Sequence, residues 1–352
     1  MQLTNEQKEA LNILKNRIKQ GEKISILQGY AGTGKSTTLR FLLDELNYFQ
    51  SDVNFVAYTG TAAKLLMDVG LRASTIHRLI YTPIFRYGVC VGFRKKSRED
   101  LEGIRLIVVD EYSMLPEELL RDLEQYDIPL LLVGDPEQLP SIGTPNRYVN
   151  QYHAILTTVH RQALDSPILW AATKIREREI LKEGSYGDIL FIGRKHQLDE
   201  SWLRKDVQFL CGLNDTRHRL NLEISGSPNP MVGEKIILLK NDWDQGLVNG
   251  SIGHIKKITK QWDKYKLNFT ADDLDYVDYL AYFKEFPPRP PRYIKNAFDK
   301  AYCITTHKAQ GATIDSPMVI IDESSYFKEY KTNWLYTALT RANGKHKVAL
   351  LR

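Results

Sequence analysis

The stretch KISILQGYAGTGKSTTLRFLLDEL, residues 23–46, carries three consecutive signals. Residues 24–27, apolar except for Ser25, predict a short buried strand, and residues 35–46 repeat apolar side chains at helical spacing. Between them, residues 29–36 match the pattern G-x-x-x-x-G-K-S. Glycines in such a loop let successive backbone N–H groups surround phosphate oxygens at a helix N-terminus, whose dipole also favours an anion. We therefore predict a nucleotide-binding site, because the flanking strand and helix disfavour the alternative of a glycine turn that binds nothing.

The residues of this loop have separate expected roles. We expect Lys35 to reach the β- and γ-phosphates and the hydroxyl of Ser36 to ligate Mg²⁺. The residues expected to hold the nucleotide are Gly29, Gly32, Thr33, Gly34, Lys35, Ser36 and Thr37.

An acidic pair and a glutamine supply the rest of a hydrolase site. Residues 104–109, apolar except for Arg105, predict a fully buried parallel strand, and this segment ends at Asp110-Glu111. Asp110 can hold Mg²⁺ through water, while Glu111 can act as general base on the attacking water. Gln138 follows a second apolar run, at 128–133, where ligands of open α/β sheets bind, so it can touch the γ-phosphate or that water. A non-functional acidic pair and a plain polar loop are the alternatives.

Length and composition bound the class of protein without identifying it. The 352 residues suggest two or three domains, and 43% hydrophobic and 26% charged residues are typical of an ordinary globular protein. No apolar run approaches the roughly 20 residues that a membrane helix needs, and the N-terminus predicts an amphipathic helix rather than a signal peptide. Cys90, Cys211 and Cys303 lie far apart, which argues against a disulfide framework or a zinc site and fits a reducing cytoplasm. The net charge of +5 is compatible with a polyanionic partner.

The rest of the chain suggests a second α/β unit with insertions. Strands and helices alternate from residue 24 to about 161, except at 81–102, where aromatic and β-branched residues precede a basic run. A second alternating unit begins near residue 206, and its last expected strand, KVALLR, leaves no extension that would recruit a partner. Residues 232–294 predict short strands with a hairpin turn at Asn249-Gly250, typical of a small β-barrel. Within them, residues 271–286 fit a helix or a strand, and PPRPPR (287–292) fits a stiff spacer better than an SH3 ligand. Residues 174–184 predict an exposed helix face.

Nine stretches together resemble the motifs of superfamily 1 helicases, specifically the RecD-like and Dda-like 5′→3′ branch, superfamily 1B, and they cover nearly the whole chain. Besides the phosphate loop they are LTNEQKEAL (3–11), YTGTAAKLL (58–66), STIHRLI (74–80), VVDEYSML (108–115), VGDPEQLPSIG (133–143), TVHRQ (158–162), AYCITTHKAQGATID (301–315) and LYTALTRA (335–342). One position departs from the family pattern. Thr61 stands where that family usually has a lysine, so a charged phosphate contact is not expected there.

The resemblance implies an α/β fold with two RecA-like parallel-sheet domains in tandem. The first, domain 1A, is expected at 1–81 and 101–162, with a small 1B insertion, a hairpin or loop, at 82–100. The second, domain 2A, is expected at 163–231 and 295–352, with an SH3-like barrel, domain 2B, inserted at 232–294.

The resemblance also assigns roles to single residues. Gln7 is expected to contact adenine, and Gln310 and Gly311 to line the nucleotide cleft. Arg161 and Arg341 are expected to neutralise charge on the γ-phosphoryl group of ATP when the two domains close. The residues expected to bind nucleic acid are Thr59, Gly60, Thr61, His77, Thr306 and His307, with Asn249 as a weaker candidate and Phe85 and Tyr87 as residues that stack on bases or wedge the junction.

These assignments predict an ATP-dependent DNA helicase with Mg²⁺ as cofactor that moves on single-stranded DNA, in the 5′→3′ direction by resemblance. Expected partners are single-stranded DNA and single-strand/duplex junctions, with a single-strand-binding or replication and recombination protein as a further candidate and no membrane. We expect a monomer in the cytoplasm of a bacterium or phage-infected cell. The alternatives are a single-strand translocase or RNA helicase, and a nucleotide-dependent switch or loader. A switch would tolerate loss of Glu111 or Arg341, and a small-molecule kinase would have no use for the second α/β unit.

Overall fold

The computed structural model describes residues 2–86, 89–141, 144–159, 166–198, 200–239, 250–261, 264–271, 274–282 and 298–352. The chain divides into two units, Met1–Asp165 and Ser166–Arg352, and each is described by itself. Among the residues described, every helix is too short or too polar to span a bilayer.

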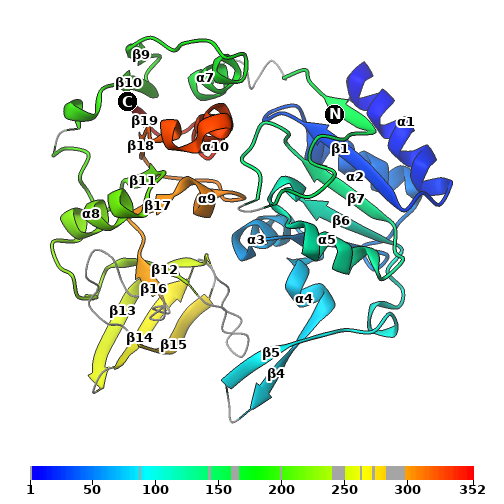
Figure 1. Ribbon diagram of the computed structural model, residues 1–352, viewed down its shortest axis with the longest axis horizontal. Coiled ribbons are helices and arrows are strands. Elements are labelled where there is room, and N and C mark those ends of the chain that lie inside the picture. Colours follow the sequence, from blue (N-terminus) through cyan, green and yellow to red (C-terminus); the bar gives the residue numbers. More distant parts are fainter. Residues whose placement is uncertain are drawn as a thin grey trace. The chain divides into compact units, whose positions relative to one another are not determined.

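The first unit is built on a six-stranded sheet in which all pairs of neighbouring strands are parallel (Figure 1). In spatial order its strands are β3 (Ala73–Thr75), β2 (Val53–Ala57), β6 (Leu106–Asp110), β7 (Leu130–Gly134), β1 (Ile24–Gly29) and β8 (Ala154–Leu156). The order places β6 and β7 in the middle of the sheet, flanked by β2 and β1. The loops after these strands therefore meet at one edge, which is where ligands of such sheets bind.

Apolar side chains cover both faces of this sheet. Alternate residues of β6 point to opposite sides, since Leu106 and Val108 belong to one buried cluster and Ile107 and Val109 to another. The first cluster packs under α1 (Asn5–Lys19) and α2 (Lys35–Leu46), and the second under α4 (Ile76–Ile80) and α5 (Glu117–Glu124). Burial on both faces explains why the strands appear in the sequence as continuous apolar runs. The remaining helical elements of this unit are α3 (Gly60–Asp68), η1 (Glu99–Leu101) and η2 (Tyr112–Met114).

A two-stranded antiparallel ribbon interrupts the α/β pattern of the first unit. It consists of β4 (Tyr81–Arg86) and β5 (Val89–Lys95), and its strands pair from Tyr81 opposite Lys95 toward the turn. Figure 1 shows the ribbon leaving α4 and extending beyond α5, away from the six-stranded sheet. The ribbon occupies the position at which the sequence predicts the 1B insertion.

The second unit contains a six-stranded sheet of the same kind. Its order is β17 (Cys303–Thr305), β11 (Gln208–Cys211), β18 (Met318–Ile321), β19 (Val348–Leu351), β10 (Leu190–Gly193) and β9 (Gly184–Tyr186). All neighbours are parallel except β9, which runs antiparallel to β10. The helical elements are α7 (Pro167–Arg176), η3 (Lys195–Gln197), α8 (Asn214–Ser225), α9 (Thr306–Ala309), η4 (Ser324–Tyr330) and α10 (Lys331–Leu339). Two sheets whose strands are parallel except for β9, with covering helices, confirm the predicted fold class.

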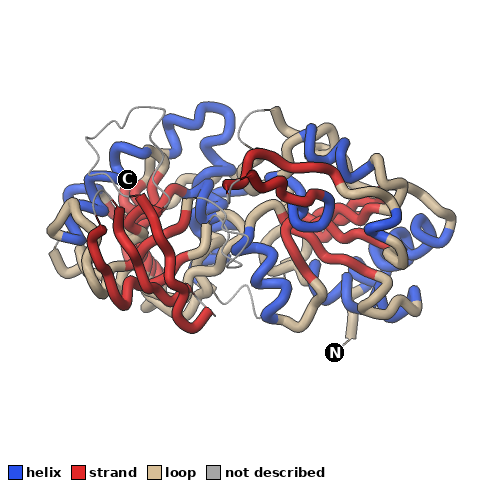
Figure 2. Tube along the Cα trace, turned by 90° about the horizontal axis from the view of Figure 1, so that it is seen from below, coloured by secondary structure: helices blue, strands red, loops and turns tan. Residues whose placement is uncertain are grey.

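An antiparallel sheet of five strands is inserted in the second unit. Its order is β15 (Leu274–Tyr282), β14 (Lys264–Ala271), β13 (Ile252–Gln261), β12 (Lys235–Leu238) and β16 (Phe298–Lys300), and these strands lie side by side in both views (Figures 1 and 2). Residues 274–282 are therefore a strand, which decides between the helix and the strand that the sequence left open. The SH3-like barrel and the domain boundaries stay predictions, and residues 287–292 lie outside the described part of the chain.

One predicted helix is wrong over most of its length. Residues 174–184 are helical only to Arg176, where α7 ends. Arg178 has a left-handed backbone with φ of 60°, and the amide of Glu179 donates to the carbonyl of Lys174 (2.9 Å). This arrangement satisfies the last carbonyls of the helix and turns the chain away, although the mixed charges of the segment suggested a longer exposed helix.

Candidate functional site

The loop between β1 and α2 has the geometry of a phosphate cradle. Gly32 and Gly34 have φ of 78° and 83°, a backbone conformation that favours glycine. α2 begins at Lys35 without a side-chain cap, so the amides of its first turn point toward the space in front of the helix. Gly29 is needed for a different reason, because a Cβ atom there would lie 2.8 Å from Thr33 Oγ1 and 3.1 Å from Leu156 Cβ.

Side chains of the loop hold it in shape. Lys35 Nζ donates to the carbonyl oxygens of Gly29 (2.7 Å) and Tyr30 (3.2 Å), and the buried hydroxyl of Thr33 donates to Tyr30 O (2.9 Å). Gly32 and Ser36 are exposed, and Thr37 is half-buried. The loop is thus held from behind while its outer surface stays accessible.

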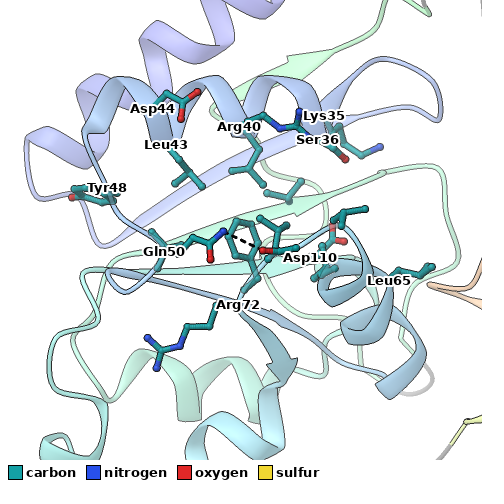
Figure 3. Close-up of a pocket in the computed structure, with 18 of the residues that line it drawn as sticks. Lys35, Ser36, Arg40, Leu43, Asp44, Tyr48, Gln50, Leu65, Arg72 and Asp110 are labelled. Carbon is teal, nitrogen blue, oxygen red and sulfur yellow. Dashed lines mark hydrogen bonds between the residues drawn. The ribbon is translucent and has the colours of Figure 1, made fainter. Parts of the chain in front are cut away.

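A cavity of about 550 Å³ brings the predicted metal ligands together. Figure 3 shows Lys35 and Ser36 on α2 at one end of it and Asp110, from the end of β6, on the facing side. A hydroxyl and a carboxylate are the hard oxygen ligands that Mg²⁺ prefers, so these residues fit that ion. Away from this end, the cavity runs between α2 and α3 over the apolar floor of β2.

Glu111 and Gln138, the predicted general base and its neighbour, lie in direct contact. Gln138 Nε2 donates to Glu111 Oε1 (3.2 Å), although the two residues follow different strands. Glu111 Oε2 and Gln138 Oε1 are buried and have no hydrogen-bond partner among the residues that the structure describes. Two neighbouring buried acceptors are suited to receive the hydrogens of a water molecule. The contact also brings together two residues that the sequence predicted separately.

Three residues that the sequence analysis did not select stabilise the turn that follows Asp110 and Glu111. Asn146 is buried, and its Nδ2 donates to the carbonyls of Tyr112 and Leu115 (both 2.9 Å), which fixes the turn that follows Glu111. Gln28 Nε2 donates to the hydroxyl of Tyr112 (2.7 Å), and burial raises the pKa of that hydroxyl to about 12. These contacts join distant parts of the chain, so no local pattern in the sequence announces them.

The first turn of α1 contacts two other segments of the site. Gln7 is buried, caps the helix together with Thr4, and donates from Nε2 to the carbonyl of Thr33 in the phosphate loop (3.2 Å). Its neighbour Glu6 accepts from the amide and hydroxyl of Thr157 (2.8 and 2.7 Å), next to the end of β8. Gln7 therefore lies beside the phosphate loop, while its contact with adenine stays a prediction.

The candidate strand-binding residues of the first unit lie at strand ends. The hydroxyl of Thr59 accepts from the amide of Ala62 (3.2 Å) and caps α3. Gly60 and Thr61 therefore lie in the first turn of that helix, which follows β2 along the chain. The N-terminus of a helix of this length favours a phosphate group. His77 lies on α4 with its ring 6.4 Å from Tyr58 and 5.6 Å from Tyr81, and burial lowers its pKa. The structure places the backbone of Phe85 in β4 and says nothing of its side chain.

The candidate residues of the second unit form another group. Arg341 is 6% exposed and donates to the carbonyls of Thr337 (3.2 Å) and Ala312 (3.3 Å), so it lies against the loop that contains Gln310 and Gly311. A guanidinium has five N–H donors, which leaves some for an anion.

The two candidates on α9 differ in accessibility. Thr306 is fully buried, and its hydroxyl donates to Cys211 O (3.4 Å), so the predicted strand contact would fall to its backbone. His307 is half-buried with its ring 5.5 Å from Phe327, and burial lowers its pKa. Tyr87, Arg161 and Asn249 lie outside the described residues.

Within the first unit, the phosphate loop, the facing carboxylate and the Glu111–Gln138 pair define a P-loop nucleotide-binding protein. A family model described as an AAA domain matches residues 2–196, more than half of the chain, and one described as a UvrD-like helicase C-terminal domain matches residues 300–351.

The chain is also similar to known proteins. It is 28% identical over 367 residues to the ATP-dependent RecD2 DNA helicase of Deinococcus radiodurans, with 92% of this chain and 46% of that protein covered. It is 31% identical over 188 residues to the ATP-dependent DNA helicase dda of Enterobacteria phage T4, with 49% of this chain and 42% of that protein covered. A solved structure of Pif1 helicases at forked dsDNA has a TM-score of 0.61 at 20% identity, covering 99% of this chain and 92% of that one.

The chain belongs to the RecD- and Pif1-like helicases of superfamily 1B, which confirms the resemblance found in the motifs. The structural likeness, at 20% identity, supports the fold of two RecA-like domains. The chain spans less than half the length of RecD2 and of the phage protein.

Proposed function

We propose that this chain is an ATP-dependent DNA helicase that moves along single-stranded DNA and separates the strands of a duplex. The observation that carries the proposal is the Glu111–Gln138 pair, with two buried acceptor oxygens, at the sheet edge where the phosphate loop also ends. A protein that only binds nucleotide has no need of a general base in this position. The related RecD2 and dda proteins are named as ATP-dependent DNA helicases, which supports the same substrate for this chain.

The first unit supplies the groups that bind ATP and activate water. The amides of the loop and Lys35 hold the β- and γ-phosphates, and Gln7 is the candidate for adenine. Glu111 orients the attacking water and accepts its proton, while Gln138 fixes the carboxylate and offers its own oxygen to the same water. Mg²⁺ held by Ser36 and Asp110 would neutralise charge on the phosphates.

The second unit supplies a cation and a further grip on the strand. We propose that Arg341 neutralises charge on the γ-phosphoryl group during hydrolysis, and that Arg161 does the same from the first unit. Thr59, Gly60, Thr61 and His77 then contact a single strand on the first unit, and His307 with the backbone of Thr306 on the second. Alternating grips, timed by hydrolysis, would move the protein along the strand.

ATP hydrolysis measured with and without nucleic acid tests the proposal. We expect a low rate for the protein by itself and a strong increase with single-stranded DNA. Lys35→Ala should abolish the activity in both conditions and serves as the control for contaminating ATPases. Stimulation by RNA but not DNA would favour the RNA helicase, and no stimulation by either would overturn the motor.

A further inference from the structure

One side chain contacts both strands of the β4–β5 ribbon at its base, where β4 begins and β5 ends. The hydroxyl of Tyr126, just after α5, contacts the carbonyl of Ile80 (3.0 Å), directly before β4, and the carbonyl of Lys96 (2.9 Å), directly after β5. The amide of Lys96 donates to the same Ile80 carbonyl (2.9 Å) and closes the base of the ribbon. Tyr126 is 5% exposed, so these contacts are shielded from water.

The carboxylate of Asp122 accepts hydrogen bonds from both strands of the ribbon at their first residue pair. Tyr81 and Lys95 lie directly opposite each other in the ribbon. The hydroxyl of Tyr81 and the ammonium group of Lys95 both donate to the carboxylate of Asp122 on α5. Lys95 Nζ also donates to Gln125 Oε1 (3.0 Å). Burial opposes ionisation of Asp122, but the bonds from Lys95 and Tyr81 prevail and lower its pKa.

The helix that holds the ribbon follows directly on the catalytic acidic pair. β6 ends at Asp110, and Glu111, η2 and α5 come next in the chain. Asn146 fixes η2 through two backbone carbonyls, and Leu119, Leu120 and Leu123 bury α5 in the core. A rigid run of fewer than twenty residues thus connects the hydrolytic centre with the base of the ribbon.

Aromatic rings connect the ribbon to the candidate strand-binding end of the first unit. Tyr58 precedes Thr59, its ring contacts His77, and His77 contacts Tyr81. The ring of Phe93 on β5 follows, 6.4 Å from Tyr81. Phe93 is 48% exposed and Ile84, on the other strand, 41%, so the arms of the ribbon present apolar surface to solvent. Such surface can pack against the bases at the end of a duplex.

We propose that Asp122 is a positioning residue that fixes the β4–β5 ribbon, which the family resemblance makes the expected wedge at the junction, to the unit that carries the phosphate loop. The wedge role of the ribbon rests on the proposed function. The attachment of the ribbon to α5 rests on the contacts described above. A two-stranded ribbon has little stability of its own, so without an anchor it would bend instead of parting base pairs. Asp122 is not among the residues assigned to the nucleotide or the strand, and its proposed effect acts through Tyr81 and Lys95.

Asp122→Asn, with Glu118→Gln as a matched control, tests the inference. Glu118 lies one turn earlier on α5 and is exposed. We expect Asp122→Asn to keep DNA-stimulated ATP hydrolysis within about twofold of the parent protein. Unwinding of a forked duplex should fall by about tenfold or more, because charge-assisted hydrogen bonds are lost. Amide hydrogen exchange in residues 81–86 and 89–95 should become faster in this variant and unchanged in Glu118→Gln.

A charge exchange provides a second variant that does not depend on how Asp122→Asn folds. Lys95→Asp combined with Asp122→Lys should recover more unwinding than either single change. Equal losses of hydrolysis and unwinding, unchanged exchange in the ribbon, or unchanged unwinding would each overturn the positioning role. If the parent protein shows no DNA-stimulated hydrolysis, the proposed function has failed, and the wedge fails with it even where the exchange data show the anchor.

Discussion

Glu111 has a left-handed backbone, with φ of 50° and ψ of 43°. A non-glycine residue in this region costs on the order of 1–3 kcal/mol, and such residues cluster at active sites. Contacts around Glu111 offset this cost. Asn146 holds the turn that follows, and the side chain of Gln138 donates to the Glu111 carboxylate.

Glu111→Gln should separate binding from chemistry. The amide keeps the size of the side chain but cannot accept the proton of water, so we expect hydrolysis to fall on the order of 10²–10⁴-fold. Nucleotide affinity, followed with a fluorescent ATP analogue, should stay close to that of the parent protein. A comparable loss of affinity would show that Glu111 holds the loop instead of activating water.

Partly buried histidines predict how stability depends on pH. Burial lowers the pKa of His77 and of His307. It also lowers the pKa of His153, whose Nδ1 accepts from the amide of Ile26 (3.0 Å). The unfolded chain therefore binds more protons than the folded one below the ordinary histidine pKa of about 6.5. The thermal unfolding midpoint should consequently fall as pH decreases from 8 to about 5.5.

A matched pair of variants checks this pH dependence. His77→Gln should make the curve flatter, whereas His196→Gln should not, because His196 is exposed. A midpoint that rises on acidification would contradict the assignment of neutral, buried histidines.

At the scale of elements, the phosphate loop depends on close packing of its first glycine. A Cβ at Gly29 would meet Thr33, Lys35 and Leu156 at 2.8–3.1 Å, whereas one at Gly92 in β5 would meet nothing within 4 Å. Gly29→Ala should therefore shift Lys35 and weaken ATP binding by about tenfold or more, with a loss of stability of about 1–3 kcal/mol. Gly92→Ala should leave both unchanged. Isothermal titration with ATP and chemical denaturation measure the two quantities, and equal behaviour of the variants would contradict the packing argument.

The elements that the sequence predicted well are those with strong periodicity. Residues 35–46 form α2 with the predicted bounds, and the strand predicted at 24–27 extends to Gly29. The runs 104–109 and 128–133 each begin pairing two residues later than predicted. Ile104 and Ile128 are buried but precede their strands, since an apolar run reports burial and not pairing. The end of α7 was missed because a left-handed Arg178 has no local signature.

The motif residues of the candidate site could be predicted from the sequence, but the residues that hold them in place could not. Lys35, Ser36, Asp110, Glu111 and Gln138 follow from sequence patterns tied to strand ends. Asn146, Gln28, Glu6 and Asp122 act through contacts between residues 27–151 positions apart, and single-sequence patterns carry no information on such pairs. Their roles become visible only once the strands are placed side by side.

At the scale of the whole molecule, the proposed ATP hydrolysis needs a contribution from the second unit. Arg341→Ala should leave ATP binding nearly intact and lower DNA-stimulated hydrolysis on the order of 10³–10⁵-fold. Arg219→Ala is the control, because Arg219 is an exposed arginine of the same unit that pairs with Glu223 on α8. Parallel losses of binding and hydrolysis would mean that Arg341 supports the fold through Thr337 and Ala312 without reaching the nucleotide.

Strand separation on tailed duplexes is the decisive test of the proposed helicase activity. With ATP and Mg²⁺ present, the protein should unwind a duplex that carries a 5′ single-stranded tail, and Lys35→Ala should not. A duplex with a 3′ tail should be unwound poorly, which would fix the direction of movement. If single-stranded DNA stimulates hydrolysis but neither tailed duplex is separated, the protein is a translocase or a switch, and the helicase proposed here is contradicted.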